Sequence, residues 1–344
     1  MASLPSELIG ATGRRYRFMN ILQERPHIGR VWTASSGQDI FVLKDIPVNI
    51  FSNFNARILP QLSKMSTTSL RVPLDTIPDQ RVFVYKYLSD DFLHLVRKGL
   101  PIQACRKVLR ATLQAISHLH GRDVVHLDIK PDNIMVQCRR TAHTTTIEQV
   151  QLTDLENAAY LPKGRCIKGM LAGNDNWRSP EAHFKGELNK PSDMFSFGLV
   201  CIYAILGRVI CGPDEDFAHH ETQGALPAMI RLQRQVSYFG DSEGLNGLMT
   251  HVGDEEVNCQ VLSMLWEDRD QDGIPYKPFS EWSELCDEQF IDLIKGLMNL
   301  DPARRISAYQ ALQHPWFLDR HGSIDSLDDT SGRLVTDDPI PADR

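Results

Sequence analysis

The apolar residues of this chain change their spacing between its first part and the remainder. Residues 16–22, 29–34 and 40–45 are short stretches rich in β-branched and aromatic side chains, and turn residues such as those at 35–37 separate them. This pattern predicts antiparallel strands. The N-terminal part of the chain is therefore expected to be β-rich.

Helical spacing dominates from residue 101 onward. Between residues 101 and 120 apolar side chains recur at steps of three and four, and Gly121 follows as a stop, which predicts a strongly amphipathic helix. Further helices are expected in four later segments, 193–206, 226–235, 287–298 and 308–314. The most apolar run, 194–206, is shorter than the about 20 residues that span a bilayer, so it predicts a buried helix.

Composition and charge limit the classes of function. A hydrophobic fraction of 42% with 24% charged residues is ordinary for a globular protein, and 344 residues suffice for two lobes. The net charge of −7 argues against nucleic acid as a partner. Seven scattered cysteines without a C-x-x-C pair favour free thiols in a reducing compartment, and the first 20 residues lack the apolar core of a signal peptide. We expect an intracellular monomer, cytoplasmic or nuclear, with no membrane partner.

The loop at residues 126–133, His-Leu-Asp-Ile-Lys-Pro-Asp-Asn, is the most informative candidate for chemistry. Phosphoryl transfer must orient a hydroxyl, accept its proton, hold the migrating group and help bind a metal ion. Asp128, Lys130 and Asn133 have the functional groups for these tasks. The spacing H-x-D-x-x-x-x-N is that of the protein-kinase catalytic loop. A three-point pattern also arises by accident, because polar turns between strands commonly contain Asp and Asn.

Five further segments, in the family's order, resemble the motifs of the eukaryotic protein kinase family. They are Phe-Val-Leu-Lys at 41–44, Asp-Leu-Glu at 154–156, the segment 173–181, the segment 193–198, and 301–306 followed by 314–317. The resemblance spans residues 16–318. It implies an α+β, bilobal protein-kinase-like fold.

The same resemblance divides the chain into four parts. A small β-rich N-lobe is expected at residues 16–88, and a large, mainly helical C-lobe at 89–318. Residues 1–15 would form an N-terminal extension. Residues 319–344 include an Asp-rich stretch with almost no large apolar side chains, which is typical of a flexible acidic tail.

The resemblance also implies roles for individual residues. Lys44 would hold the α- and β-phosphates of ATP, and Asn133 and Asp154 would hold Mg²⁺. Asp128 would orient the hydroxyl of a protein substrate and accept its proton, while Lys130 stabilises charge on the transferred group. A lysine two residues after the catalytic Asp is the family's serine/threonine type.

The nucleotide pocket and one buried ion pair follow from the same comparison. Val31, Val42 and Met135 would enclose the adenine between apolar side chains. The hinge, Lys86-Tyr87-Leu88, would hydrogen-bond the adenine through its backbone, and Tyr85 would be the gatekeeper residue in front of it. Glu181 and Arg305 would form a buried pair that ties the activation segment to the large lobe, and loss of either partner would strand the other charge.

Three departures from the family's pattern concern the nucleotide. The phosphate-covering loop retains only Gly29 of its three glycines, and Pro26 there lacks an N–H donor. Asn55 stands where the small-lobe helix normally supplies a glutamate to the lysine, and no glutamate occurs between residues 24 and 148. Lys44 is therefore expected to pair with Asp154, a water or a backbone carbonyl. Glu156 replaces the glycine of D-F-G and is expected to add negative charge near the metal site.

Other departures concern regulation. Leu127 replaces the arginine that pairs with a phosphorylated activation loop in many kinases, and residues 154–181 contain no threonine. Phosphorylation of this segment is therefore not expected to act as a switch. Asn174 replaces a threonine that braces the catalytic loop, and its side-chain amide is expected to bridge Asp128 and Lys130. Arg178 resembles a residue of the branch that includes the cyclin-dependent and splicing-factor kinases.

Two functional hypotheses remain open from the sequence. The first is an ATP- and Mg²⁺-dependent serine/threonine protein kinase, slowed by its altered small lobe. It depends on the presence of the catalytic and metal-binding side chains named above. The second is a pseudokinase, a nucleotide-binding or scaffolding module that transfers little phosphate. It depends on Asn55, Glu156 and the missing glycines.

Overall fold

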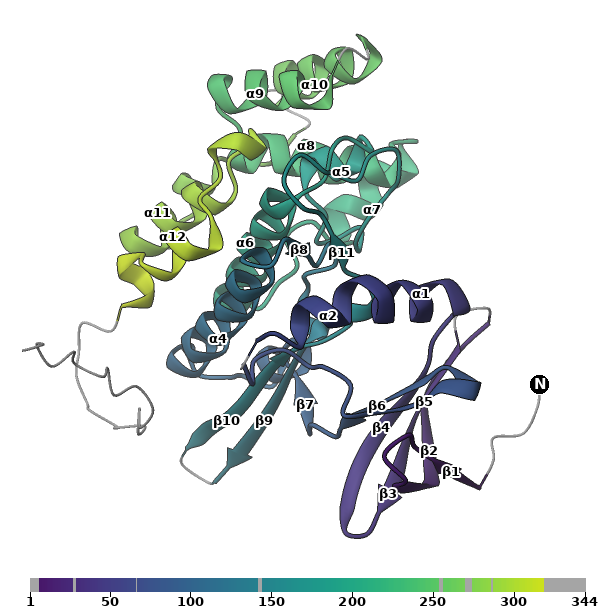
Figure 1. Ribbon diagram of the computed structural model, residues 1–344. Coiled ribbons are helices and arrows are strands. Elements are labelled where there is room, and N and C mark those ends of the chain that lie inside the picture. The colour runs from purple at the N-terminus through teal and green to yellow at the C-terminus, as the bar shows by residue number, and fades with distance from the viewer. Residues whose placement is uncertain are drawn as a thin grey trace, which may run out of the picture.

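The computed structural model describes residues 6–26, 29–65, 67–141, 144–253, 256–269, 274–285 and 287–318. It has two lobes, one built around a β-sheet and one mainly of helices (Figure 1). The α+β, bilobal architecture expected from the sequence is confirmed. The predicted acidic tail at 319–344 lies outside the described residues.

The small lobe contains a six-stranded antiparallel sheet in the order β1-β2-β3-β4-β6-β5. Its strands are β1 (Glu7–Ile9), β2 (Arg15–Arg25), β3 (Gly29–Ser36), β4 (Asp39–Asp45), β5 (Asp75–Ile77) and β6 (Val82–Lys86). The three strands predicted in the first 45 residues are confirmed. β1 lies within the predicted N-terminal extension and pairs with β2, so that part of the extension belongs to the sheet.

Alternation along β4 separates the two faces of the sheet. Phe41 and Leu43 pack into a small core on one face, while Val42 joins the main core that continues into the large lobe. Because side chains alternate along a strand, Lys44 lies on the same face as Val42. The register places Val31 opposite Lys44 and Tyr85 opposite Val42. The predicted lysine and the apolar residues therefore share the face directed toward the large lobe.

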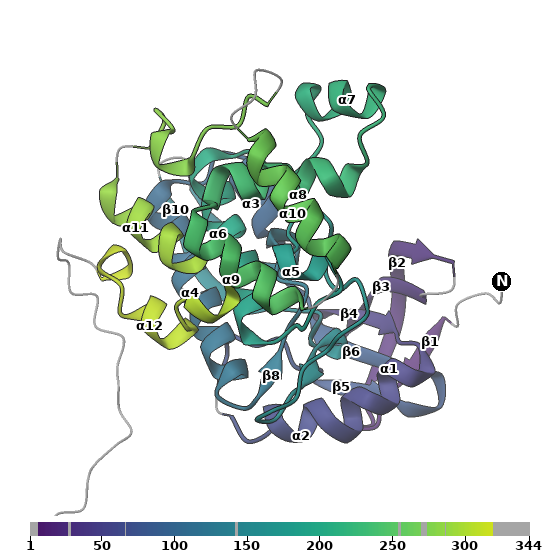
Figure 2. The same cartoon turned by 90° about the horizontal axis from the view of Figure 1, so that it is seen from above.

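A broken helical segment lies between the sheet and the large lobe (Figures 1 and 2). It comprises α1 (Val48–Asn53), a π-helical turn η1 (Phe54–Ile58) and α2 (Leu59–Leu62). Phe54, Ile58 and Leu62 are buried and anchor it in the main core. This segment occupies the place of the expected small-lobe helix, with Asn55 in η1.

The large lobe is built on two long helices that pack against each other, α4 (Ile102–His120) and α6 (Lys190–Leu206). Residues 192–204 of α6 are all buried, which confirms the predicted buried helix. The remaining helices are α3 (Phe92–Arg97), α5 (Pro180–His183), α7 (Glu215–Thr222), α8 (Pro227–Phe239), α9 (Ser242–Val252), α10 (Glu256–Asp268), α11 (Glu288–Leu297) and α12 (Ala308–Leu312). No described helix is long and apolar enough to cross a membrane.

Five predicted helices, α4, α6, α8, α11 and α12, are confirmed within a few residues. The sequence did not predict α7, α9 and α10. In α7 only Phe217 is buried, and in α10 only Leu262 and Leu265 are buried. Helices that bury so few side chains leave a weak apolar period in the sequence.

Short strands frame the loop 126–133. β8 (Val124–Val125) pairs with β11 (Ala159–Tyr160), and β9 (Ile134–Arg140) pairs with β10 (Thr145–Leu152) and with β7 (Asp90–Asp91). In the β9–β10 pair, residues 145–152 lie opposite residues 134–140. Six 3₁₀ turns complete the described elements: η2 (Pro78–Gln80), η3 (Pro131–Asn133), η4 (Leu155–Asn157), η5 (Phe279–Glu281), η6 (Pro302–Arg304) and η7 (Pro315–Phe317).

Candidate active site

The loop 126–133 is fixed from below by a buried carboxylate of α6. Asp193, which is 1% exposed, accepts the backbone N–H of His126 at 2.8 Å and that of Leu127 at 2.7 Å. Its Oδ2 also lies 2.9 Å from Nε2 of His120. These bonds hold Leu127 in a left-handed conformation, with φ of +63°, which is uncommon for a residue other than glycine.

Replacement of Asp193 by asparagine is expected to destabilise the protein. The new NH₂ group would face either the N–H of Leu127 or the N–H of His126 and ring nitrogen of His120, so that a buried donor loses its acceptor. We expect the free energy of unfolding to fall by about 1–3 kcal/mol, measured by urea denaturation. Asp292→Asn, on a side chain that is 78% exposed, is the matched control and should change it little.

His126 connects the loop to the Asp154 segment. Its Nε2 lies 2.7 Å from the carbonyl oxygen of Thr153, the residue before Asp154, and its Nδ1 accepts the N–H of Asp128 at 3.2 Å. The imidazole is fully buried. His126 is therefore a structural link between the loop and the Asp154 segment.

Asp128 is held through both of its carboxylate oxygens. Oδ1 accepts the backbone N–H of Asn174 at 3.0 Å, and Oδ2 accepts Nδ2 of Asn133 at 3.1 Å. Lys130 Nζ lies 3.1 Å from the same Oδ2. Burial by itself would lower the pKa of Lys130, but the charges of Asp128 and Asp132 together outweigh burial and raise that pKa. The three loop residues singled out in the sequence thus form one bonded set.

Asn174 contributes differently from the expectation. Its backbone N–H bonds to Asp128, while its side-chain oxygen accepts the N–H of Asn176 at 3.0 Å. The prediction that its side-chain amide bridges Asp128 and Lys130 is wrong. A backbone donor needs no particular side chain, so residue identity at 174 gave no signal for this bond.

The oxygen atoms near Asp128 suit a hard divalent cation. Both Nδ2 bonds of Asn133, at 2.8 Å to the carbonyl and 3.1 Å to the carboxylate of Asp128, orient its amide. In the described part of the chain no donor bonds to Oδ1 of Asn133 or to Oδ2 of Asp154. Carboxylate and amide oxygens of this kind are the ligands that Mg²⁺ prefers. The two residues therefore fit the metal role expected of them.

Lys44 lies between two carboxylates. Its Nζ is 2.8 Å from Oδ1 of Asp154 and 2.5 Å from Oε1 of Glu156. Burial by itself would lower the pKa of Lys44, but the charges of Glu156 and Asp154 outweigh burial and raise it. Burial likewise would raise the pKa of Asp154, and Lys44 lowers it. Of the three alternatives that the sequence left open for Lys44, the structure shows the pairing with Asp154.

The pairing of Lys44 with Glu156 was not anticipated. Glu156 was expected to add charge near the metal site, whereas its side chain is 3% exposed and turned toward the lysine. The hydroxyl of Tyr85 donates to Oε2 of Glu156 at 3.4 Å. A sequence clue existed in the unusual glutamate beside Asp154, but the spacing does not reveal which cation it meets.

Arg71 extends this buried group to the hinge. Its guanidinium lies 5.1 Å from the ring centre of Tyr85 and donates to the carbonyl of Lys86 at 2.8 Å. Burial lowers the pKa of Arg71, and burial, together with the charge of Glu156, raises that of the Tyr85 phenol well above its usual value. Nothing in the motif pattern had singled out Arg71.

The predicted adenine-binding residues lie on two sides of the junction between the lobes. Val31 and Val42 pack in the main core from the sheet side, and Met135 lies on β9 of the large lobe. Leu88 is buried, whereas the side chain of Lys86 lines an outer hollow of about 460 Å³. In the hinge, the backbone N–H of Tyr87 donates to the carbonyl oxygen of Ile40 at 3.1 Å.

Gly29 has a structural requirement of its own. Its φ is +126°, and a Cβ atom there would lie 2.7 Å from Cβ of Asp45. Any larger residue at position 29 would therefore clash where β3 and β4 approach. The glycine is explained by the sheet without reference to phosphate, and residues 27 and 28 of the same loop lie outside the described part.

The activation segment is joined to the large lobe by hydrogen bonds of Arg178 and by apolar contacts of Leu127. Arg178 donates to the carbonyls of Ala172 and Gly173, both at 2.8 Å. Leu127 packs against a small apolar cluster of Ile167, Ala172, Ala182 and Leu188. The leucine that replaces the usual arginine is thus in apolar contact with residues of this segment.

Glu181 and Arg305 form the ion pair expected from the sequence. The guanidinium donates to Oε1 at 2.8 Å and to Oε2 at 2.7 Å, and both side chains are fully buried. Ser192 also donates to Oε1 at 2.8 Å. Burial would raise the pKa of Glu181, but the charge and bonds of Arg305 lower it to about 2.

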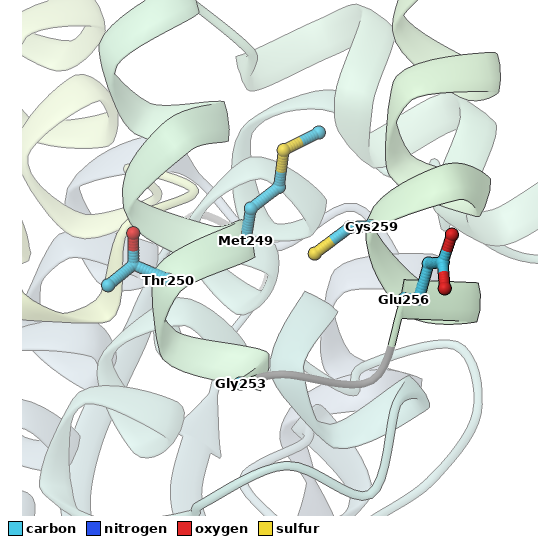
Figure 3. Close-up of a pocket in the computed structure, with 5 residues that line it drawn as sticks. All are labelled: Met249, Thr250, Gly253, Glu256 and Cys259. Carbon is cyan, nitrogen blue, oxygen red and sulfur yellow. The ribbon is translucent and has the colours of Figure 1, made fainter.

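A hollow of about 370 Å³ lies elsewhere, between α9 and α10 (Figure 3). Met249 and Cys259 direct their side chains into the space between these helices, and Glu256 points away from it. Figure 1 shows both helices at the end of the large lobe remote from the sheet. This hollow is therefore separate from the group around Asp128.

Comparison with known proteins agrees with this arrangement. A model of the protein kinase domain matches residues 48–317. Dual specificity tyrosine-phosphorylation-regulated kinase 3 from Rattus norvegicus is 24% identical over 304 residues, which cover 81% of this chain and 49% of that protein. The chain thus spans about half the length of this curated relative.

Two other relatives are similarly distant. Serine/threonine-protein kinase AFC1 from Arabidopsis thaliana is 22% identical over 68% of this chain and 54% of its own length. Dual specificity protein kinase CLK4 from Mus musculus is 24% identical over 63% of this chain and 46% of its own length. The domain model matches most of the residues of this chain, and the two lobes adjoin the loop 126–133. The chain belongs to the protein kinase family.

Proposed function

We propose that this protein is an ATP- and Mg²⁺-dependent kinase that transfers the γ-phosphate of ATP to serine or threonine hydroxyls of proteins. The observation that carries the proposal is the bonded set around Asp128. Its carboxylate is oriented by Asn133 and Asn174, and Lys130 lies 3.1 Å away. A pseudokinase under no demand for catalysis would not need all of these groups together.

Each member of the set has a distinct task in this proposal. Asp128 orients the substrate hydroxyl and accepts its proton, and Lys130 offsets negative charge on the transferred group. Asn133 and Asp154 hold Mg²⁺ through their oxygen atoms. When bound, the metal ion neutralises charge on the phosphates. Lys44 binds the phosphates from the side of the sheet.

The hydroxyl specificity is the finer part of the proposal. Lys130 supports serine and threonine, and the name of the Arabidopsis thaliana relative states this specificity. The names of the Rattus norvegicus and Mus musculus relatives state dual specificity. Phosphoamino acid analysis of the labelled product separates the two, because phosphotyrosine above background would contradict serine/threonine specificity.

A nucleotide-binding module without transfer is the second candidate. One observation favours it: Lys44 Nζ bonds directly to Oδ1 of Asp154 at 2.8 Å, so the cation proposed for phosphate and the carboxylate proposed for metal already neutralise each other. Pro26 and the missing glycines of the phosphate-covering loop also favour the candidate without phosphate transfer. In this candidate the protein binds nucleotide but leaves its γ-phosphate in place.

Addition of Mg²⁺ and ATP is expected to raise the melting temperature of the purified protein. A ligand that binds only the folded state at 100 times its Kd adds about 2.7 kcal/mol to stability, which corresponds to several degrees for a protein of this size. Chelation with EDTA should reduce the shift. The measurement is thermal unfolding, combined with transfer of labelled phosphate to a mixture of serine, threonine and tyrosine peptides.

The combined result distinguishes the candidates. A thermal shift with transfer above background supports the kinase. A shift without any transfer favours the binding module and rejects the kinase. Absence of both shift and transfer rejects both candidates.

A further inference from the structure

The small-lobe helical segment offers no carboxylate to Lys44. Residues 48–62, which form α1, η1 and α2, contain neither Asp nor Glu. The Nδ2 of Asn55 in η1 donates back to the carbonyl of Phe51 in α1 at 2.9 Å, within the same broken helical segment. A partly buried ammonium in this position still requires an anionic partner, because an unpaired charge away from water is costly.

Glu156 meets this requirement from a different part of the chain. Its Oε1 lies 2.5 Å from Lys44 Nζ, and its side chain is 3% exposed. The turn η4 that contains it contacts both α1 and η1, so the carboxylate approaches the lysine where the small-lobe helix passes the Asp154 segment.

The carboxylate is itself held in place. The Tyr85 hydroxyl donates to Oε2 at 3.4 Å, and Arg71 stacks on the Tyr85 ring, 5.1 Å from its centre. Lys44 and Tyr85 therefore contact different oxygens of Glu156. Asp154 also touches Lys44, but it is the proposed metal ligand. In the described structure, Glu156 is thus the one carboxylate in ion-pair contact with Lys44 that has no other proposed task.

We propose that Glu156 is the positioning residue for Lys44, so that the lysine is anchored from the Asp154 segment of the large lobe instead of from the small-lobe helix. This inference rests on the proposed function, since it concerns the lysine that would bind ATP. It also means that movement of the small-lobe helix would not by itself break the lysine's ion pair.

The test is a double-mutant cycle on ATP affinity, with Glu156→Gln, Lys44→Met and both together. Glu156→Gln keeps the shape of the side chain and removes its charge. We expect it to weaken ATP binding about tenfold or more, and to raise the KM for ATP more than it lowers kcat. With Lys44→Met already present, Glu156→Gln should have almost no further effect on affinity, because the contact it serves is gone.

Two comparisons separate positioning from a purely structural role. Glu148→Gln makes the same chemical change on the β9–β10 hairpin, where Glu148 pairs with Arg139, and should leave ATP affinity unchanged. Glu156→Asp retains the charge and should restore part of the lost affinity. A structural role would instead weaken ATP binding equally in the presence and in the absence of Lys44.

The outcomes separate this inference from the kinase proposal. If the wild-type protein binds ATP without transferring phosphate, the kinase proposal fails and the binding cycle still tests Glu156. If the wild-type protein transfers phosphate and Glu156→Gln matches it in ATP affinity and KM, the inference about Glu156 fails alone. Failure of the wild-type protein to bind ATP would overturn both.

Discussion

Replacement of Asp128 by asparagine is expected to lower phosphate transfer by about 10²–10⁴-fold, the usual contribution of a positioned general base. The amide cannot accept the proton of the attacking hydroxyl. Its NH₂ group would also face either the Asn174 N–H or the Asn133 Nδ2 and Lys130 donors, which disturbs the alignment of the loop. The measurement is the initial rate of transfer at saturating Mg²⁺ and ATP.

Two controls make this result specific. Asp79→Asn introduces the same change at an exposed position of the 3₁₀ turn η2 and should keep the wild-type rate. The thermal shift produced by Mg²⁺ and ATP should survive in Asp128→Asn, because Asp128 is assigned to the hydroxyl and not to the nucleotide. If Asp128→Asn transfers phosphate as fast as the wild-type protein, the catalytic role proposed for Asp128 is wrong.

The largest loss of stability is expected from breaking the Glu181–Arg305 pair. Arg305→Met removes two hydrogen bonds to Glu181, at 2.8 and 2.7 Å, and leaves a fully buried carboxylate without its cation. Removal of one partner of such a pair typically costs about 3–5 kcal/mol. We expect a loss of this size in urea denaturation, together with release of the activation segment from the large lobe.

The neighbouring residue provides a matched control. Arg304 pairs with Glu243 at 2.6 Å, but both side chains are exposed. Arg304→Met should change the free energy of unfolding little, since solvent screens exposed ion pairs. Equal effects of the two Arg→Met changes would contradict the importance assigned to the buried pair.

The Glu181–Arg305 pair also predicts how the stability of the protein changes at acid pH. The pKa of Glu181 in the folded protein is lowered to about 2, below the about 4.3 of an unfolded chain. Its contribution to stability is therefore fully present above the unfolded value and is lost as the pH falls from about 4.3 toward 2. Stability of Glu181→Gln should fall less steeply with decreasing pH across this window than that of the wild-type protein.

Much of the fold followed from local sequence patterns. The strands around residues 16–45 and the helix ending at His120 appear where the apolar period predicts them, because burial of one face imposes that period on the side chains. Helices α7, α9 and α10 were missed. In α7 and α10 only one or two buried side chains contact the rest of the lobe, too few to mark a stripe.

The residues of the candidate site likewise fall into those that the sequence identified and those that only the structure revealed. Asp128, Lys130 and Asn133 lie within one short loop, so the chain itself brings them together and their spacing suffices to find them. Arg71 joins the site, and Tyr85 meets Glu156, only because β6 and the segment that follows α2 meet the Asp154 turn in the folded protein. No local period records such a contact.

By itself the sequence determined the order of the motifs, the β-rich small lobe, the buried helix α6 and the content of the loop 126–133. Only the tertiary structure decided which carboxylates hold Lys44. The two ends of that ion pair lie in different lobes, and the attraction between charges depends on distance in space, which leaves no periodic trace along the chain. For this reason Glu156 was expected as a disturbance of the metal site and is found beside the lysine.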